Sequence, residues 1–183
     1  TLYNGLISGV SLDGTHFFYL NPLASSGQHA RSPWFSCACC ISNMTRFLPS
    51  VPGYVYAQNG NNLYVNLFVS NTSDIQLEGG KVSLSQTTNY PWDGKINLQI
   101  NEAPKTNFSL RVRIPGWSQQ EPVPGDLYYT HETNKHIVIK VNGQPFTYKM
   151  ENGYAVISRK WNKNDKVDFD LNMQPFKIFA NNK

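Results

Sequence analysis

Cysteine is nearly absent from this sequence. The chain has three cysteines, Cys37, Cys39 and Cys40, and none before or after that short stretch. This excludes a disulfide framework spread along the chain. Adjacent cysteines do not easily bridge each other, and the spacing is not the Cys-x-x-Cys of a thioredoxin-like site or a zinc ribbon. The cluster therefore needs another explanation.

Long runs of charged residues and long runs of apolar residues are also missing. Only 15% of the residues are charged, and the formal net charge of +4 comes from scattered Lys and Arg. Without a basic run, the charge does not indicate a nucleic-acid surface. No apolar stretch approaches the roughly 20 residues that span a bilayer, and the N-terminus lacks a signal-peptide pattern. We expect a soluble protein without a nucleic-acid or membrane partner, and leave its compartment open between bacterial cytoplasm and periplasm.

The chain has ample material for a folded core, with 40% hydrophobic and 13% aromatic residues among 183. It starts at Thr-Leu-Tyr-Asn and stops at Asn-Asn-Lys without a capping or terminal pattern. We therefore expect it to be a piece of a longer protein.

From residue 51 onward, short runs of alternating apolar and polar residues predict β-strands. Dipeptides that accept a positive φ separate many of them, namely Asn59-Gly60, Gly79-Gly80, Asn142-Gly143 and Asn152-Gly153. The pattern predicts a mainly β fold, an antiparallel jelly-roll-like β-sandwich of about ten strands with almost no helix. Residues 118–133 read as a long loop. The predicted strands are Tyr54–Tyr56, Leu63–Phe68, Ile96–Ile100, Phe108–Ile114, Ile137–Val141, Tyr154–Ser158, Val167–Leu171 and Phe176–Phe179.

The first 50 residues have a different character. Leu2–Gly9 has the pattern of the last turns of a helix closed by glycine, and His16–Leu20 that of the second arm of a hairpin. Residues 39–48 place Ile41, Met44 and Leu48 on one helical face, with prolines near the end. This helix would start at Cys39 and Cys40.

A helix N-terminus gives the cysteines a chemical role. Its unsatisfied N–H groups carry about half a positive charge, which stabilises a thiolate, the nucleophilic and metal-binding form of cysteine. A tetrahedral zinc site needs four ligands, so the cluster could supply only part of one. The alternative is that these small apolar residues merely pack the start of the helix. Spacing alone does not decide between the two.

The residues around the cysteines carry a resemblance. The chain resembles glycoside hydrolase family 127, the β-L-arabinofuranosidase family, formerly a domain of unknown function. Cys-Cys-x-x-Asn at residues 39–43 and Arg-Ile-Pro-Gly-Trp at residues 113–117 form the most specific pair of motifs. The other matching stretches are Leu2–Asn4, Phe17–Leu23, Trp34-Phe35, Arg46, Leu63–Leu67, Val141–Gly143 and Gly153-Tyr154, with Trp161 and Asp165.

The resemblance implies a fold and a set of roles. Residues 1–50 would be the C-terminal remnant of an (α/α)6 catalytic barrel, and residues 51–183 the β-sandwich that follows it. Cys39 would be the nucleophile that forms a thioglycosyl intermediate in a retaining, zinc-dependent glycosidase acting on β-L-arabinofuranosides. Cys39 and Cys40 would be zinc ligands, Tyr19 would hydrogen-bond near the reacting centre, and Cys37 would line the site.

Part of the family site is missing from these 183 residues. No Glu-x-Cys pair is present to complete the zinc ligands, and the acid/base glutamate would precede Thr1. Ile41 stands where the family usually has proline. We therefore expect zinc only in the complete parent, and no turnover by this chain alone.

Sugar sites also need aromatic platforms and polar groups. Trp34 and Phe35 are candidate platforms by position, although core packing explains most aromatic residues. His16 and His29 are candidate polar groups, and surface histidines are the common alternative. We expect a carbohydrate partner. The competing reading of the whole chain is a non-catalytic β-sandwich that binds carbohydrate, with structural cysteines.

Overall fold

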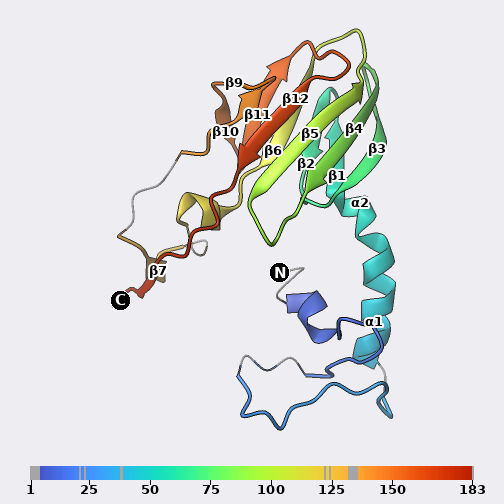
Figure 1. The fold of residues 1–183 in the computed structure, drawn as a ribbon, viewed down its shortest axis with the longest axis vertical. Helices are drawn as coiled ribbons and strands as arrows, with labels where there is room; N and C mark the ends of the chain where they lie inside the picture. The colour runs from blue at the N-terminus through green and yellow to red at the C-terminus, as the bar shows by residue number, and fades with distance from the viewer. Residues whose placement is uncertain are drawn as a thin grey trace. The chain divides into compact units, whose positions relative to one another are not determined.

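The computed structural model describes residues 5–20, 22, 24–37, 39–121, 123, 125–131 and 136–182. Two compact units divide the chain, Thr1–Gly53 and Tyr54–Lys183 (Figure 1). No helix in the described part of the chain is long and apolar enough to cross a membrane.

The first unit contains the predicted helix. Helix α1 spans Cys39–Phe47 and passes into a 3₁₀ turn, η3, at Leu48–Ser50. Proline at position 49 has no N–H for the α-helical ladder, which explains why the α-helix stops before it. On the inner face of α1, Ile41 is buried and Met44 is half-buried. The prediction for residues 39–48 is confirmed except at its last residue.

The segment before α1 is mostly irregular. A 3₁₀ turn, η2, spans Ile7–Gly9, so the described end of the predicted Leu2–Gly9 helix is helical and stops at the glycine. Residues 2–4 lie outside the described residues. The predicted hairpin is reduced to two isolated bridges, in which Phe17 pairs with both Val10 and Ser32.

The second unit holds two sheets facing each other (Figure 1). The five-stranded sheet has the order β1-β2-β6-β11-β10. Its strands are β1 (Tyr56–Asn59), β2 (Asn62–Val65), β6 (Phe108–Arg113), β11 (Tyr154–Arg159) and β10 (Lys149–Glu151).

The six-stranded sheet has the order β3-β4-β5-β12-β8-β9. Its strands are β3 (Asn71–Leu77), β4 (Gly80–Thr88), β5 (Lys95–Glu102), β12 (Lys166–Asp170), β8 (Lys140–Val141) and β9 (Gln144–Pro145). A separate two-stranded sheet pairs β7 (Tyr128–Tyr129) with β13 (Phe179–Ala180).

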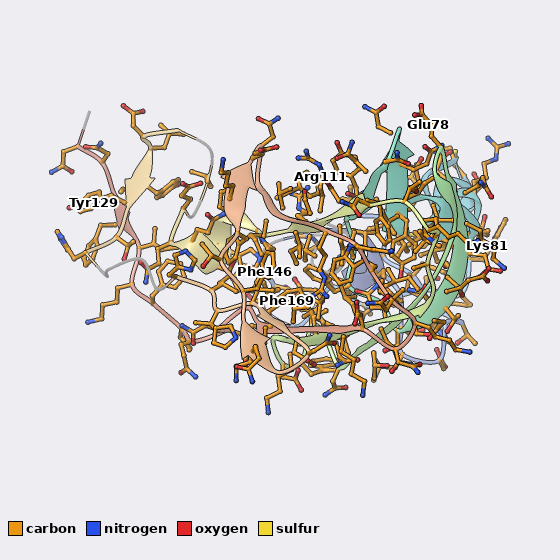
Figure 2. All side chains as sticks on the ribbon, turned by 90° about the horizontal axis from the view of Figure 1, so that it is seen from above. Glu78, Lys81, Arg111, Tyr129, Phe146 and Phe169 are labelled. Atoms are coloured by element: carbon orange, nitrogen blue, oxygen red, sulfur yellow. The ribbon has the colours of Figure 1, made fainter. Side chains whose placement is uncertain are left out.

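One hydrophobic core joins the two large sheets. Alternate residues of each strand point inward, as Ile96, Leu98 and Ile100 do on β5, and all three are at most 2% exposed. Figure 2 shows Phe169 of β12 in the interior and Lys81 at the margin. This alternation is the signal from which the sequence predicted a sandwich, and the predicted fold class is confirmed.

The glycine-containing turns also behave as predicted. Asn142-Gly143 closes the β8–β9 hairpin with φ values of 53° and 79°, and Asn152-Gly153 closes β10–β11 with 51° and 80°. Two consecutive positive φ angles are typical of the hairpin turn that Asn-Gly favours.

Several details differ from the sequence prediction. Tyr54 and Val55 belong to a short helix, α2 (Pro52–Val55), because proline suits the first helical position, and β1 starts only at Tyr56. One strand pair is parallel: β2 pairs with β6 in the same direction after the chain has crossed to the other sheet for β3, β4 and β5. Such a pairing requires a long crossover, which alternation within each strand does not reveal.

The predicted loop at residues 118–133 contains more structure than expected. It starts within a 3₁₀ turn, η4 (Gly116–Gln119), and includes β7. Residues 122, 124 and 132–135 lie outside the described residues. The described strands number thirteen, against about ten predicted. The two long strands β3 and β4 match none of the predicted runs, and several other strands are only two residues long.

Candidate functional site

The candidate nucleophile stands at the first residue of α1. The Cys39 side chain is exposed, and its Sγ lies 3.0 Å from the hydroxyl oxygen of Tyr19, within hydrogen-bonding distance. Either atom can donate, so the pair fits both a thiol and a thiolate that accepts the phenol proton. The structure thus brings together two predicted site residues that are 20 positions apart in the sequence.

Tyr19 is held by backbone pairing on one side and by an aromatic neighbour on the other. Phe17, two residues before Tyr19, exchanges two backbone hydrogen bonds of 2.9 Å each with Ser32. The Tyr19 and Phe35 rings lie 5.4 Å apart between centroids and are tilted by 59°. Phe35 therefore contacts the site tyrosine, a role that the sequence analysis did not assign to it.

Arg31 contacts both the end of η2 and the Phe18 ring. We call this set of contacts the Arg31 brace, and the sequence analysis missed it. Its guanidinium Nη2 donates to the Ser8 carbonyl at 2.7 Å and its Nε to the Gly9 carbonyl at 3.3 Å, at the end of η2. The same guanidinium lies 4.3 Å from the centroid of the Phe18 ring. A guanidinium over the face of an aromatic ring is attracted by the negative charge of that face, so this contact stabilises the position of Arg31. No spacing in the sequence marks Arg31, because its partners are backbone carbonyls and a ring brought near by folding.

His29 belongs to the same brace. Its ring stacks on Phe18 with centroids 4.6 Å apart, and its Nε2 lies 2.8 Å from the Leu20 carbonyl oxygen. This distance fits a hydrogen bond that Nε2–H donates to the carbonyl oxygen. In a neutral ring, Nδ1 is then the acceptor nitrogen. His29 was predicted as a polar site residue; it contacts the two residues that flank Tyr19, Phe18 and Leu20, and its role toward a substrate stays a prediction.

The asparagine of the Cys-Cys-x-x-Asn motif has a visible local contact. Asn43 Nδ2 donates to the Cys39 carbonyl at 3.0 Å, and Ser42 Oγ donates to the same oxygen at 3.1 Å. Both bonds fasten the backbone of the cysteine to the first turn of α1. The spacing of the motif follows from helix geometry, because residues three and four apart lie on one face.

Three other predicted residues lie at the surface. Cys37 is exposed, and Trp34 is 67% exposed, with its carbonyl accepting a hydrogen bond of 2.8 Å from Ser32 Oγ. His16 is exposed, with its Nδ1 2.7 Å from Thr15 Oγ1. The roles of Trp34 and Cys37 toward a substrate stay predictions.

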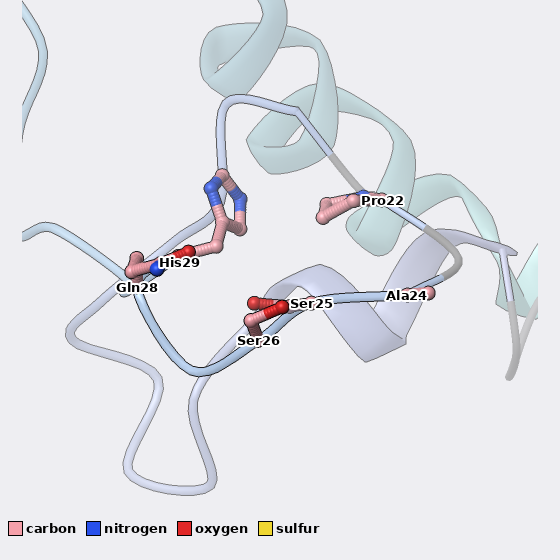
Figure 3. A pocket seen from close by; sticks show the side chains of 6 residues that line it. All are labelled: Pro22, Ala24, Ser25, Ser26, Gln28 and His29. Carbon is pink, nitrogen blue, oxygen red and sulfur yellow. The ribbon is translucent and has the colours of Figure 1, made fainter.

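A shallow pocket follows Leu20 along the chain (Figure 3). It has a volume of about 590 Å³, and its lining includes Ser25, Ser26, Gln28 and His29. Gly27 adopts a φ of 95° in this loop, and its N–H donates to Ser25 Oγ at 3.1 Å. The pocket presents hydroxyl and amide groups, which suit polyhydroxyl ligands.

The described residues do not by themselves fit a zinc site. Within the described ranges, no three His, Cys, Asp or Glu side chains gather closely enough to hold a metal ion. The side chain of Cys40, the second predicted ligand, lies outside what the structure describes. A tetrahedral site built on Cys39 would therefore need ligands from elsewhere.

Comparison with protein families gives matches along most of the chain. The model described as the GH127 middle domain of beta-L-arabinofuranosidase matches residues 62–173. The model described as the GH127 catalytic domain of beta-L-arabinofuranosidase matches residues 1–53.

Individual proteins give a consistent result. The chain is 29% identical over its whole length to a non-reducing end beta-L-arabinofuranosidase of Bifidobacterium longum, of which it covers 27%. A solved GH127 beta-arabinofuranosidase is 48% identical, with a TM-score of 0.91 over 99% of this chain and 28% of the other. A GH127 beta-L-arabinofuranosidase from Geobacillus stearothermophilus T6 is 35% identical, with a TM-score of 0.74 over 92% of this chain and 26% of the other. The chain thus spans about a quarter of the length of these relatives.

Proposed function

Because the chain belongs to glycoside hydrolase family 127, we propose that it is the part of a retaining β-L-arabinofuranosidase that carries the cysteine nucleophile, Cys39. The observation that supports this most directly is the 3.0 Å approach of the Tyr19 hydroxyl to the Cys39 sulfur at the N-terminus of α1. A thiolate there benefits from the helix dipole and from a phenol donor.

The proposed reaction has two displacements. The Cys39 thiolate attacks the anomeric carbon, a C–S bond forms, and the glycosidic C–O bond breaks as its oxygen takes a proton from a carboxylic acid. Water then attacks the same carbon, gives its proton to the resulting carboxylate, and releases the cysteine as thiolate. Two inversions at one carbon give net retention of configuration.

Within this chain, Tyr19 would orient and stabilise the sulfur, and Asn43 would hold the Cys39 backbone in place. From the resemblance to the family, the acid/base glutamate would precede Thr1. We propose that it is supplied by another part of the parent protein.

We further propose that the complete protein binds zinc through Cys39 and Cys40 and two further ligands outside this chain. A bound zinc ion would favour the thiolate form of the cysteines. With two candidate ligands of four, this chain should bind zinc weakly. Isothermal titration with zinc, compared between this chain and an N-terminally extended form, tests the proposal, and tight binding by the short chain would contradict it.

Activity is tested on an aryl β-L-arabinofuranoside. The extended form should hydrolyse it and this chain should not, because losing general acid catalysis alone costs a factor of roughly 10² to 10⁴. In the extended form, Cys39→Ser should abolish turnover, whereas the matched change Cys37→Ser should reduce kcat/KM far less. An extended Cys39→Ser variant as fast as its parent would overturn the assignment and favour the non-catalytic reading, in which the chain is a carbohydrate-binding sandwich.

A further inference from the structure

The outer face of the six-stranded sheet carries a groove that the catalytic proposal does not use. It has a volume of about 710 Å³ and lies across the ends of β4, β5, β12 and β8, four neighbouring strands. Its lining includes residues of the loop that joins β4 to β5, and Val138, whose side chain is 56% exposed.

A continuous row of polar side chains crosses the groove, whose lining also includes apolar atoms. The registers pair Thr87 of β4 with Asn97 of β5, Asn97 with Asp168 of β12, and Asp168 with Lys140 of β8. All four line the groove, while their strand neighbours Ile96 and Phe169 are buried in the core. The row therefore presents a hydroxyl, an amide, a carboxylate and an ammonium group side by side on the outer face.

The two middle residues of this row, Asn97 and Asp168, are hydrogen-bonded to each other. Asn97 Nδ2 donates to Asp168 Oδ1. The side-chain Oδ1 of Asn97 and the second carboxylate oxygen of Asp168 are then the acceptors that can face a ligand. A second cross-strand pair, Lys95 and Asp170, lies beside the first row and also lines the groove. Preformed polar groups lower the entropy that binding must overcome.

The loop at one end of the groove carries an exposed tryptophan, which is not itself part of the groove lining. Trp92 lies between Asn89 and Asp93, which both line the groove, and its side chain is 83% exposed. Hydrogen bonds brace this loop, from Trp92 N to the Asn89 carbonyl at 2.9 Å and from Lys95 N to Asp93 Oδ1 at 3.0 Å. These bonds order the backbone of the loop, and an exposed aromatic ring carried by such a loop offers a stacking surface for the apolar face of a ligand.

The charges of the groove indicate a neutral ligand. Three carboxyl groups, of Asp93, Asp168 and Asp170, stand against the two ammonium groups of Lys95 and Lys140. Carboxylates would repel a phosphate or a uronic acid, and the strands are central ones whose backbone is already paired, so they cannot add a peptide strand. Alternating donors and acceptors along the groove match a chain of sugar hydroxyls.

We propose that this groove of the second unit binds a neutral, arabinofuranose-containing oligosaccharide. The choice of sugar rests on the proposed function, whereas the site does not depend on the nucleophile. Such a site would hold a polymeric substrate near the enzyme and raise its effective concentration at the catalytic unit.

The test uses this 183-residue chain and an arabinofuranose tetrasaccharide as the probe. NMR titration should shift the Trp92 indole N–H and the Asn97 side-chain amide signals together, with a dissociation constant in the millimolar range or tighter. Trp92→Ala should weaken binding about tenfold, and Asn97→Ala about three- to tenfold. Gln99→Ala is the matched control, because Gln99 is on the outer face of the same strand outside the groove, and it should leave binding unchanged.

Absence of these shifts at saturating probe, or an equal loss for Gln99→Ala and Asn97→Ala, would overturn the proposal. Shifts confined to Trp34 and other residues of the first unit would also overturn it. The NMR titration measures binding and needs no turnover. If the groove does not bind the probe, the proposal for Cys39 is unaffected. If the Cys39→Ser variant is active, the proposal for the groove is unaffected.

Discussion

The hydroxyl of Tyr19 and the sulfur of Cys39 lie 3.0 Å apart, although the two residues come from a bridged loop and a helix start. A hydrogen bond to a thiolate favours the charged form, and a helix N-terminus acts in the same direction. The contact with Tyr19 and the helix start are therefore two separate features that favour a thiolate over a thiol at Cys39.

Removing the phenol hydroxyl should weaken the nucleophile. In the extended form, Tyr19→Phe should lower kcat/KM roughly 10- to 100-fold, since hydrogen bonds to charged groups contribute about 1.5–3 kcal/mol. The pH dependence of Cys39 alkylation should also move to higher pH in this variant. Tyr128→Phe, which alters an exposed tyrosine of β7, is the control. An unchanged alkylation profile in Tyr19→Phe would mean that the hydroxyl only packs beside the sulfur.

Cys39 should be the most reactive thiol of the chain. Cys37 and Cys39 are both exposed, so accessibility alone does not separate them, whereas only Cys39 begins a helix. Alkylation with limiting iodoacetamide, followed by mass spectrometry of the peptides, measures the preference. Faster labelling of Cys37 would contradict the role of the helix N-terminus.

Asp165 should make the second unit sensitive to acid. Burial raises the pKa of its carboxyl, but hydrogen bonds from Asn142 Nδ2 (2.8 Å) and Asn162 N (2.9 Å) and the Arg159 guanidinium outweigh it, so the pKa lies below its usual range. A lowered folded-state pKa contributes stability above the unfolded-state pKa of about 4, and this is lost as pH falls through the folded value.

The Asp165→Asn variant should lack this contribution at neutral pH. It should be less stable at pH 7 by about 1–3 kcal/mol, with a smaller further loss between about pH 4 and pH 2 than the parent shows. Urea unfolding at several pH values measures both effects. Glu78→Gln changes an exposed carboxyl at the margin of the sandwich (Figure 2) and should leave the pH profile as it was.

The core between the sheets should dominate stability. Leu110 is fully buried on β6, so Leu110→Ala should lower the free energy of unfolding by about 2–5 kcal/mol. Leu127→Ala removes the same atoms from a side chain that is 68% exposed and should change it by less than about 0.5 kcal/mol. Urea unfolding followed by circular dichroism makes the comparison. Equal effects of the two changes would contradict the placement of the core.

The sequence by itself determined the fold class and the helix that starts at Cys39. Alternation with a period of two and Asn-Gly turns are local signals, since the strand pleat and positive φ angles act on neighbouring residues. The spacing of Ile41 and Met44 determined α1 in the same way. The same local rules failed where pairing is distant, as in the parallel β2–β6 pair and the two-residue pairing of β7 with β13.

Only the tertiary structure decided which side chains act together. The approach of Tyr19 to Cys39, the Arg31 brace under Phe18, and the polar row from Thr87 to Lys140 each join residues far apart in the sequence. Their partners are backbone carbonyls, ring faces and cross-strand neighbours, which have no fixed spacing along a chain. Such contacts depend on sheet register and on the path of the connecting loops, and these are settled by packing of the whole unit.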